Sequence, residues 1–451
     1  MEMRYVIILL CFLLTASLIG VGVDAQAPDK EWRKYPPDAI RSDFLLLRDT
    51  LQKIHPGLYR YKTKEVMDAL LDSCYSSIRD SMTVFEFYRV VSVVIAAIED
   101  GHADCKLPQY SMLDLVKHTR MWPWRLWFTA DKTYVFCGKN GFAPGTEIVS
   151  IDRHPIGEII NRMFDCLPSD GAIRTGKLHA LNDNFRRFSL LYCFVYGPKS
   201  IFTVEYRNVA GEIQEADLPA DYVSNIRCDI KPEEEKGLGL DFRPNGVAVL
   251  TVGTFETGKE KFDDFLESSF AEINRKQCKA LIIDLRNNGG GADGNGAALY
   301  SYLTNKSFSY YSSLEAVQRK IRPEEHPQLQ LQQPAANPFL GKAYFLINGN
   351  SFSATAEFSA VARSEKRGVF IGEETGGGYY GNTSGYDRLV VLPNTDIRVD
   401  VPLIKYTMAV RPAEYPDRGI IPEYPVGRTL ADMMAGRDVV LAYALNLAGA
   451  N

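Results

Sequence analysis

The fold is decided by the stretch Ala343-Tyr-Phe-Leu-Ile-Asn-Gly-Asn-Ser-Phe-Ser-Ala-Thr-Ala-Glu357, which continues to Gly378. Its first five residues are apolar and predict a buried strand, while the Asn, Gly and Ser residues that follow predict a tight turn. Apolar residues then recur at helical spacing, at Phe358, Val361 and Ala362. The stretch therefore predicts a strand, a turn and a helix, with Ser353 in the turn.

Ser353 has surroundings that suit a nucleophile. At the start of a helix the backbone N–H groups have no intrahelical partner and the helix dipole favours negative charge, so an oxyanion formed beside Ser353 would be stabilised. Serine in this position also commonly caps the helix, and either Ser351 or Ser353 could do so here. The stretch alone leaves both roles open.

A second segment repeats this pattern. The apolar run Lys279-Ala-Leu-Ile-Ile-Asp-Leu285 predicts a strand, Arg286-Asn-Asn-Gly-Gly-Gly291 predicts a loop, and a helix of small residues is expected from Gly296 to Leu303. An earlier strand at 247–252 and a helix at 262–275 lead into it, which indicates parallel neighbours. Both loops should lie at the carboxyl ends of strands, where open α/β sheets bind their ligands.

These segments resemble the C-terminal processing (tail-specific) protease and tricorn-core family of serine peptidases. The resemblance is carried by Asp284 to Gly291 (Asp-Leu-Arg-x-Asn-x-Gly-Gly), Ser353-Ala354, Ile371-Gly-Glu-Glu-Thr-Gly-Gly-Gly378 and the closing Gly419-Ile-Ile-Pro422. It implies an α/β core with a parallel-rich sheet and flanking helices, an N-terminal helical region and a PDZ-like β domain. It also implies hydrolysis of peptide bonds in a peptide or protein substrate, without a cofactor or metal.

The resemblance also implies the site residues. Ser353 matches the nucleophile, and Gly290 and Ala354 match the residues whose N–H groups hold the oxyanion. The lysine base of the bacterial branch would fall at Gly378, so that lysine is absent. His102, in Asp100-Gly-His102, matches the histidine base of the tricorn-core branch, and imidazole has the near-neutral pKa that a serine's base needs. We therefore expect an exported bacterial form with a histidine base, although a lone histidine can equally be a surface or structural residue.

The acidic partner of the base is left open between Glu414 and Asp417, either of which could instead be a surface charge. Two other functions also stay open. A catalytically inactive, exported peptide-binding protein would keep the fold, and a hydrolase of non-peptide esters or amides would keep the site. A dinucleotide site is formally suggested by Gly289-Gly-Gly-Ala-Asp-Gly294 with Glu315, but 308–314 reads poorly as the second buried strand that such a site needs.

The first residues predict export. Arg4, an apolar stretch from Tyr5 to Val21 and the small-residue exit Ala25-Gln-Ala27 are typical of a secretory signal peptide at 1–27, with an uncleaved anchor as the alternative. No later segment reaches about 18 uninterrupted apolar residues, so no integral membrane segment is expected after cleavage. The predicted location is periplasmic or extracellular.

Several domains are expected after the signal peptide. Helical spacing dominates up to about Asp104, including a capping box at Thr83-Val-Phe-Glu86, and short strands dominate from Trp122, with Ala143 to Asp152 resembling a PDZ-like core. The predicted segments are a helical region at 28–120, a PDZ-like domain at 121–220 with a helical insert at about 159–194, a linker at 221–245, the α/β core at 246–430 and a C-terminal helix at 431–451.

Composition and charge narrow the partners. With 46% hydrophobic and 24% charged residues, the 451-residue chain is globular, and its net charge of −5 offers no basic surface for nucleic acid. Loss of Cys11 with the signal peptide would leave seven of eight cysteines, an odd number, and most lie in apolar contexts that favour packing as small hydrophobes. The oligomeric state is not indicated.

Overall fold

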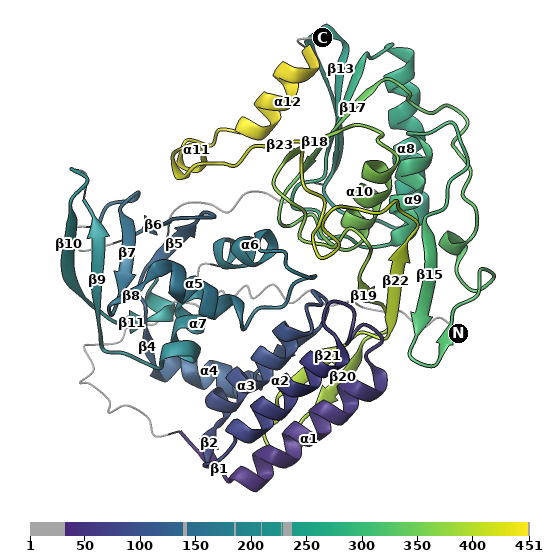
Figure 1. Cartoon of the computed structure of the whole chain (residues 1–451). Coiled ribbons are helices and arrows are strands. Elements are labelled where there is room, and N and C mark those ends of the chain that lie inside the picture. Colours follow the sequence, from purple (N-terminus) through teal and green to yellow (C-terminus); the bar gives the residue numbers. More distant parts are fainter. Residues whose placement is uncertain are drawn as a thin grey trace, which may run out of the picture.

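The computed structural model describes residues 32–138, 142–184, 186–208, 210–226, 228 and 237–449, and the predicted signal peptide at 1–27 lies outside them. The described chain forms a helical unit, a sheet unit with three helices, and an α/β core (Figure 1). Among these residues, no helix combines the length and the apolar character needed to cross a bilayer.

The core is built on a six-stranded sheet. Its strands, in spatial order, are β12 (Leu238–Arg243), β13 (Val247–Val252), β14 (Ala280–Asp284), β17 (Lys342–Ile347), β18 (Val369–Gly372) and β23 (Tyr424–Pro425). All neighbours from β13 to β23 are parallel, and β12 pairs antiparallel with β13. The predicted parallel-rich sheet is therefore confirmed. The predicted linker at 221–245 is wrong in its last part, where strand β12 forms. This strand is part of the core sheet because its alternate residues Leu238, Leu240 and Phe242 pack against the core.

Helices cover both faces of this sheet. One face carries α8 (Lys259–Arg275), α9 (Asp293–Ser301) and α10 (Ala354–Ser364), and the other carries α12 (Val439–Gly449), which follows the short α11 (Leu430–Met434). Alternate residues of each strand face opposite sides, so Leu281 and Ile283 of β14 pack under the first set while Ile282 packs under α12. The core therefore has three layers.

A smaller antiparallel sheet extends the core. Its strands, in spatial order, are β16 (Arg319–Lys320), β15 (Tyr311–Ala316), β22 (Ile404–Met408) and β19 (Thr383–Ser384). Among the described residues, three short 3₁₀ helices lie in connections, at η1 (Val223–Asn225), η2 (Pro244–Gly246) and η3 (Pro327–Leu329).

The helical unit combines four helices from the first part of the chain with two strands from a late segment. Its helices are α1 (Pro37–Ile54), α2 (Lys64–Ser77), α3 (Val84–Ala97) and α4 (Gln109–His118), with a small sheet of β1 (Lys34–Tyr35) and β2 (Met82–Thr83). The capping box at Thr83 and Glu86 is confirmed. A second sheet joins β3 (Asp104–Lys106) to β21 (Arg398–Val401) and β20 (Arg388–Val391), so a late segment of the chain completes this unit.

The sheet unit is antiparallel throughout. Its larger sheet contains β5 (Arg125–Phe128), β6 (Thr133–Cys137), β7 (Glu147–Ile151), β8 (His154–Pro155), β9 (Ile201–Arg207) and β10 (Ile213–Pro219), and β4 (Arg120–Met121) pairs with β11 (Asp221–Tyr222). The expected helical insert consists of α5 (Ile156–Phe164), α6 (Thr175–Asp183) and α7 (Arg187–Tyr196). The likeness to a PDZ domain stays a prediction.

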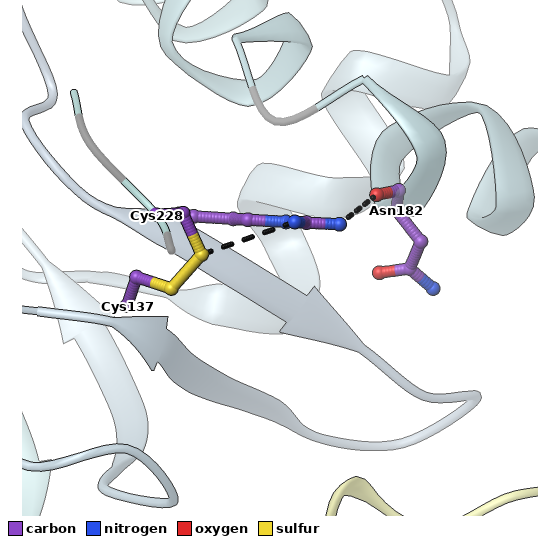
Figure 2. The surroundings of a disulfide bond; sticks show 4 residues. Cys137, Asn182 and Cys228 are labelled. Carbon is purple, nitrogen blue, oxygen red and sulfur yellow. Dashed lines mark hydrogen bonds between the residues drawn. A yellow bond between two sulfur atoms is a disulfide. The ribbon is translucent and has the colours of Figure 1, made fainter. Parts of the chain in front are cut away.

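A disulfide joins Cys137 of β6 to Cys228, which lies 91 residues later in the sequence (Figure 2). Beside it, the Arg125 guanidinium lies 3.9 Å from Cys228 Sγ and donates a hydrogen bond to the Asn182 carbonyl oxygen at 3.3 Å. The other five cysteines of the described chain are free thiols. All five lie in or against hydrophobic clusters, which confirms the expectation that most cysteines pack as small hydrophobes.

Candidate active site

Ser353 occupies a strained turn between β17 and α10. Its φ of 54° and ψ of −128° are uncommon for a residue with a side chain, and such conformations persist only where the surrounding structure enforces them. The Phe352 N–H donates to the Asn288 carbonyl at 3.1 Å, which ties the serine turn to the glycine loop after β14. The turn is therefore held in place from the neighbouring strand's loop.

Neither serine of this turn caps the helix. The Ser353 side chain makes no capping hydrogen bond. Ser351 is fully buried, donates to the Leu285 carbonyl at 2.9 Å and accepts from the Asn348 N–H at 3.1 Å. The capping alternative is therefore wrong: Ser351 joins the two loops, and the Ser353 hydroxyl stays free for another partner.

That partner is His102. Its Nε2 lies 3.1 Å from Ser353 Oγ, although 251 residues separate the two in sequence, and its ring stacks on Phe352 with centroids 4.5 Å apart. The side chain is 18% exposed, so it is accessible but largely enclosed. The structure thus brings the predicted base and nucleophile together, and His102 is not an isolated surface residue.

Gly101 allows this approach. A Cβ atom added there would lie 2.7 Å from the Phe352 ring, so a larger residue would require Phe352 or the His102 turn to shift. The Gly101 N–H donates to Asp170 Oδ1 at 2.8 Å. The turn that carries His102 is therefore fixed on both sides.

Asp100 is buried behind His102. Its Oδ1 accepts from the His102 N–H at 2.9 Å and lies 3.9 Å from His102 Nδ1, while its Oδ2 lies 3.1 Å from His55 Nε2. Burial raises the pKa of Asp100, but the two histidines and the backbone N–H lower it more, so the net pKa falls below the ordinary value. Asp100 belongs to the motif Asp100-Gly-His102, which predicts no role for it, and His55 follows α1 at a position that carries no motif.

Asp170 is a second buried carboxyl at this place. Its oxygens accept from the Gly101 N–H at 2.8 Å and from the Gly378 N–H at 3.0 Å. Burial raises its pKa, and the charge of His102 lowers it by less. Ligand atoms of Asp100, His102 and Asp170 all lie within 4.8 Å of one another, a donor set that could hold a metal by residue type. Since both Asp170 oxygens already accept backbone amides, protein donors satisfy this carboxyl.

Gly378 stands where the bacterial branch would carry its lysine. The residue is buried, and an added Cβ would lie 2.9 Å from the Tyr61 hydroxyl and 3.6 Å from Asp170 Cβ. The space for a long side chain is therefore filled. In the described part of the chain, the one side-chain hydrogen bond found for Ser353 is to His102.

The two predicted oxyanion donors differ. Ala354 is the first residue of α10, and no partner for its N–H is found among the described residues. Gly290 lies next to it with φ of 103°, and an added Cβ would be 2.6 Å from Ser353 Cβ. The Gly290 N–H, however, donates to Asn288 Oδ1 at 2.9 Å. In this conformation Ala354 alone offers an open amide.

The two candidate acids lie elsewhere. Glu414 and Asp417 are both exposed, and no contact of either with His102 is found in the described chain. The Asp417 carbonyl instead accepts from the Ala172 N–H at 2.8 Å. The carboxyls beside His102 are Asp100 and Asp170, which the family motifs did not single out.

Glu357 is another buried carboxyl, one turn along α10 from Ser353. It accepts hydrogen bonds from the Tyr311 hydroxyl and the Asn382 side chain, both at 2.7 Å. Burial, with the charge of Asp293, raises the pKa of Glu357 to about 7. The sequence did not predict this buried carboxyl, because the residues around Glu357 are apolar and indicate only a buried helix.

Helix α6 of the sheet unit packs on the serine turn. A Cβ at Gly349 would lie 2.5 Å from the Thr175 backbone, and Asn350 donates to Asp183 at 2.7 Å. His179 Nε2 lies 2.6 Å from Glu373 Oε2, which adds a hydrogen bond to this contact. All three units therefore meet at Ser353.

Comparisons with known proteins show what the chain is similar to. Residues 246–402 match the model of "Peptidase family S41". A tail-specific protease of Haemophilus influenzae is 30% identical over 131 residues, which are 29% of this chain and 17% of that protein, so the chain matches only a small part of its relative. The matched family segment contains Gly290, Ser353 and Ala354 but not His102.

Solved structures extend the likeness to most of the chain. The structure of mature CPAF complexed with lactacystin has a TM-score of 0.61 at 15% identity, covering 92% of this chain and 99% of that one. A crystal structure of mature CPAF has a TM-score of 0.60 at 15% identity, covering 92% and 97%. At these identities the likeness establishes the fold.

Proposed function

We propose, from the match of residues 246–402 to the model of peptidase family S41, that this chain is an exported serine-type endopeptidase that cleaves peptide or protein substrates. The observation that carries the proposal is the 3.1 Å contact between His102 Nε2 and the hydroxyl of the strained Ser353. A nucleophile within hydrogen-bond reach of a base is the arrangement that activates serine.

The reaction follows from these positions. Ser353 Oγ attacks the peptide carbonyl carbon while His102 Nε2 takes the hydroxyl proton. The oxyanion accepts the Ala354 N–H, and the Gly290 N–H can join only by giving up its bond to Asn288. His102 then protonates the leaving amine as the C–N bond breaks. Water, deprotonated by His102, hydrolyses the acyl-enzyme and frees Ser353.

Covalent labelling by a fluorophosphonate tests the nucleophile. We expect the purified wild type to gain one adduct at Ser353, and Ser353→Ala and His102→Ala to gain none or to react at least about 10³-fold more slowly. Ser268→Ala and His118→Ala, both at exposed positions, are matched controls and should react like the wild type.

Two alternatives give different results. A folded wild type that resists labelling would contradict the enzyme and favour the inactive, exported peptide-binding protein. Labelling with turnover of simple esters but not of peptides would favour a non-peptide hydrolase. Export itself is tested by the N-terminal mass of the protein recovered outside the cytoplasm, which should lack residues 1–27.

A further inference from the structure

We propose that Asp100 is the carboxylate that positions His102, and that buried His55 is a second positioning residue that holds Asp100 ionised and aligned. This inference rests on the proposed function, because it concerns the base that activates Ser353. Glu414 and Asp417 were the predicted acidic partners, but both are exposed. The proposed partner instead belongs to a row of three neighbouring side chains inside the helical unit, His55, Asp100 and His102.

His102 can act as the base only when its own proton is on the other ring nitrogen. For Nε2 to accept the Ser353 hydroxyl proton, a neutral His102 must carry its own proton on Nδ1. Nδ1 is buried and has no hydrogen-bond partner among the described residues. The nearest carboxylate oxygen recorded is Asp100 Oδ1, at 3.9 Å, so Asp100 supplies the negative charge closest to this N–H. As His102 becomes an imidazolium, the attraction to Asp100 grows.

Asp100 is itself held from the opposite side. Its Oδ2 lies 3.1 Å from His55 Nε2, in a place where the two side chains are 5% and 0% exposed. Neither atom has an aligned hydrogen bond in the described part of the chain, so this 3.1 Å contact is the close polar approach recorded for both. A buried carboxylate needs such a partner, because an ion without one would be strongly destabilised.

The tautomer of His55 is fixed by its other nitrogen. The Gly57 N–H donates to His55 Nδ1 at 3.1 Å, and a nitrogen that accepts carries no proton. A neutral His55 therefore has its proton on Nε2, the nitrogen that lies 3.1 Å from Asp100 Oδ2. Gly57 is required for this turn, since an added Cβ would lie 2.2 Å from Thr383 Oγ1.

Asp170 has a different role. Each of its oxygens accepts a backbone amide, from Gly101 and Gly378, so it fastens the His102 turn to the core. Burial raises the pKa of Asp170, whereas the net pKa of Asp100 is lowered, so the site favours the ionised form of Asp100 more than that of Asp170.

Other titratable groups lie near His55, Asp100 and His102. Tyr61 lies beside the two carboxyls, and its pKa is raised by burial. Asp387 also senses the charge of His102, although burial raises the pKa of Asp387. Neither contacts His102 in the described chain, so Asp100 remains the group that can align the ring.

The test measures the second-order rate of fluorophosphonate labelling against pH. Asp100→Asn should lower the rate about 10³- to 10⁴-fold and move the midpoint of its pH profile to lower pH, because the imidazolium loses its anion. His55→Phe keeps a ring but no donor and should lower the rate about 10- to 100-fold. His55→Gln keeps an N–H near the position of Nε2 and should restore most of it.

Glu414→Gln and Asp417→Asn are controls and should keep the wild-type rate and pH profile. The proposal is overturned if Asp100→Asn keeps both, or if His55→Phe and His55→Gln lose the same rate, which would show a merely structural histidine. If Asp100→Asn does not fold, the two His55 variants decide. A wild type without labelling would defeat the proposed function, whereas a labelled wild type with unaffected variants would defeat this inference alone.

Discussion

The α/β core and the helical unit contribute to the candidate site in different ways. The core supplies Ser353 and Gly290 from two loops at the carboxyl ends of the adjacent strands β14 and β17, so local backbone geometry places them. The helical unit supplies His102, whose surroundings come from His55, Asp170 and other distant residues. The nucleophile is thus built within one unit, whereas the base depends on the docking of another.

Docking relies on contacts between side chains and backbone groups. Arg60 of the helical unit donates to the carbonyl oxygens of Asn382, Tyr380 and Tyr406, at distances of 2.8 to 3.2 Å. Asp170 joins the His102 turn to Gly378 as described. The base is therefore held against the core by polar contacts rather than by a shared apolar core, since the two units have separate hydrophobic clusters.

Gly290→Ala tests whether the reactivity of Ser353 depends on the backbone geometry of the two core loops. The new Cβ would lie 2.6 Å from Ser353 Cβ, and φ of 103° is unfavourable for alanine, so the serine turn must shift. We expect fluorophosphonate labelling to slow about 10³-fold, the size of effect seen when an oxyanion site is disrupted. The rate is compared with that of Gly289→Ala.

Gly289 is a matched control because an added Cβ there would meet no atom within 4 Å. It should label like the wild type. Equal rates for the two alanine variants would show that the close approach of the glycine loop to Ser353 is unimportant, and the core would then be no more constrained than the helical unit.

Glu357→Gln tests a charge buried wholly within the core. Burial raises the pKa of Glu357 from 4.5 to about 7, so the folded state favours the protonated form. Stability from this group is therefore greatest below pH 4.5 and is lost as the pH rises towards 7. We expect the wild type to lose about 3 kcal/mol of unfolding free energy, relative to Glu357→Gln, between pH 4.5 and pH 8.

Urea unfolding at several pH values measures this difference. Glu365→Gln, at the exposed end of the same helix, should keep the pH dependence of the wild type. Parallel pH curves for Glu357→Gln and the wild type would contradict a buried, titrating Glu357.

The same contrast explains what the sequence could predict. The strands of the core, the glycine loop and the serine turn follow from apolar periodicity and turn residues within about ten positions, and the structure confirms those elements. Strand β12 was missed because the charged run before it suggested a linker. The partners of His102 were missed because His55, Asp100 and Asp170 come from separate elements, and no local pattern shows which buried carboxyls will meet.

Asp43→Asn tests how far the helical unit can be weakened without affecting the base. Asp43 of α1 is fully buried and accepts four hydrogen bonds from Asn394 and Thr395, at 2.7 to 3.1 Å, which hold the β20–β21 turn on the helix. Asparagine replaces one acceptor oxygen by a donor, so we expect a loss of about 1 to 3 kcal/mol in urea unfolding. Asp49→Asn, exposed on the same helix, should lose almost nothing.

Labelling of folded Asp43→Asn should stay within about twofold of the wild type, since a destabilised protein keeps its site while it remains folded. The reason is that His102 is aligned by Asp100 and fastened through Gly101, neither of which contacts Asp43. A labelling rate that falls in proportion to stability would instead show that the packing of the whole helical unit sets the position of the base. In that case the two units would differ in how much structure each needs: one turn would place Ser353, whereas the whole helical unit would be needed to place His102.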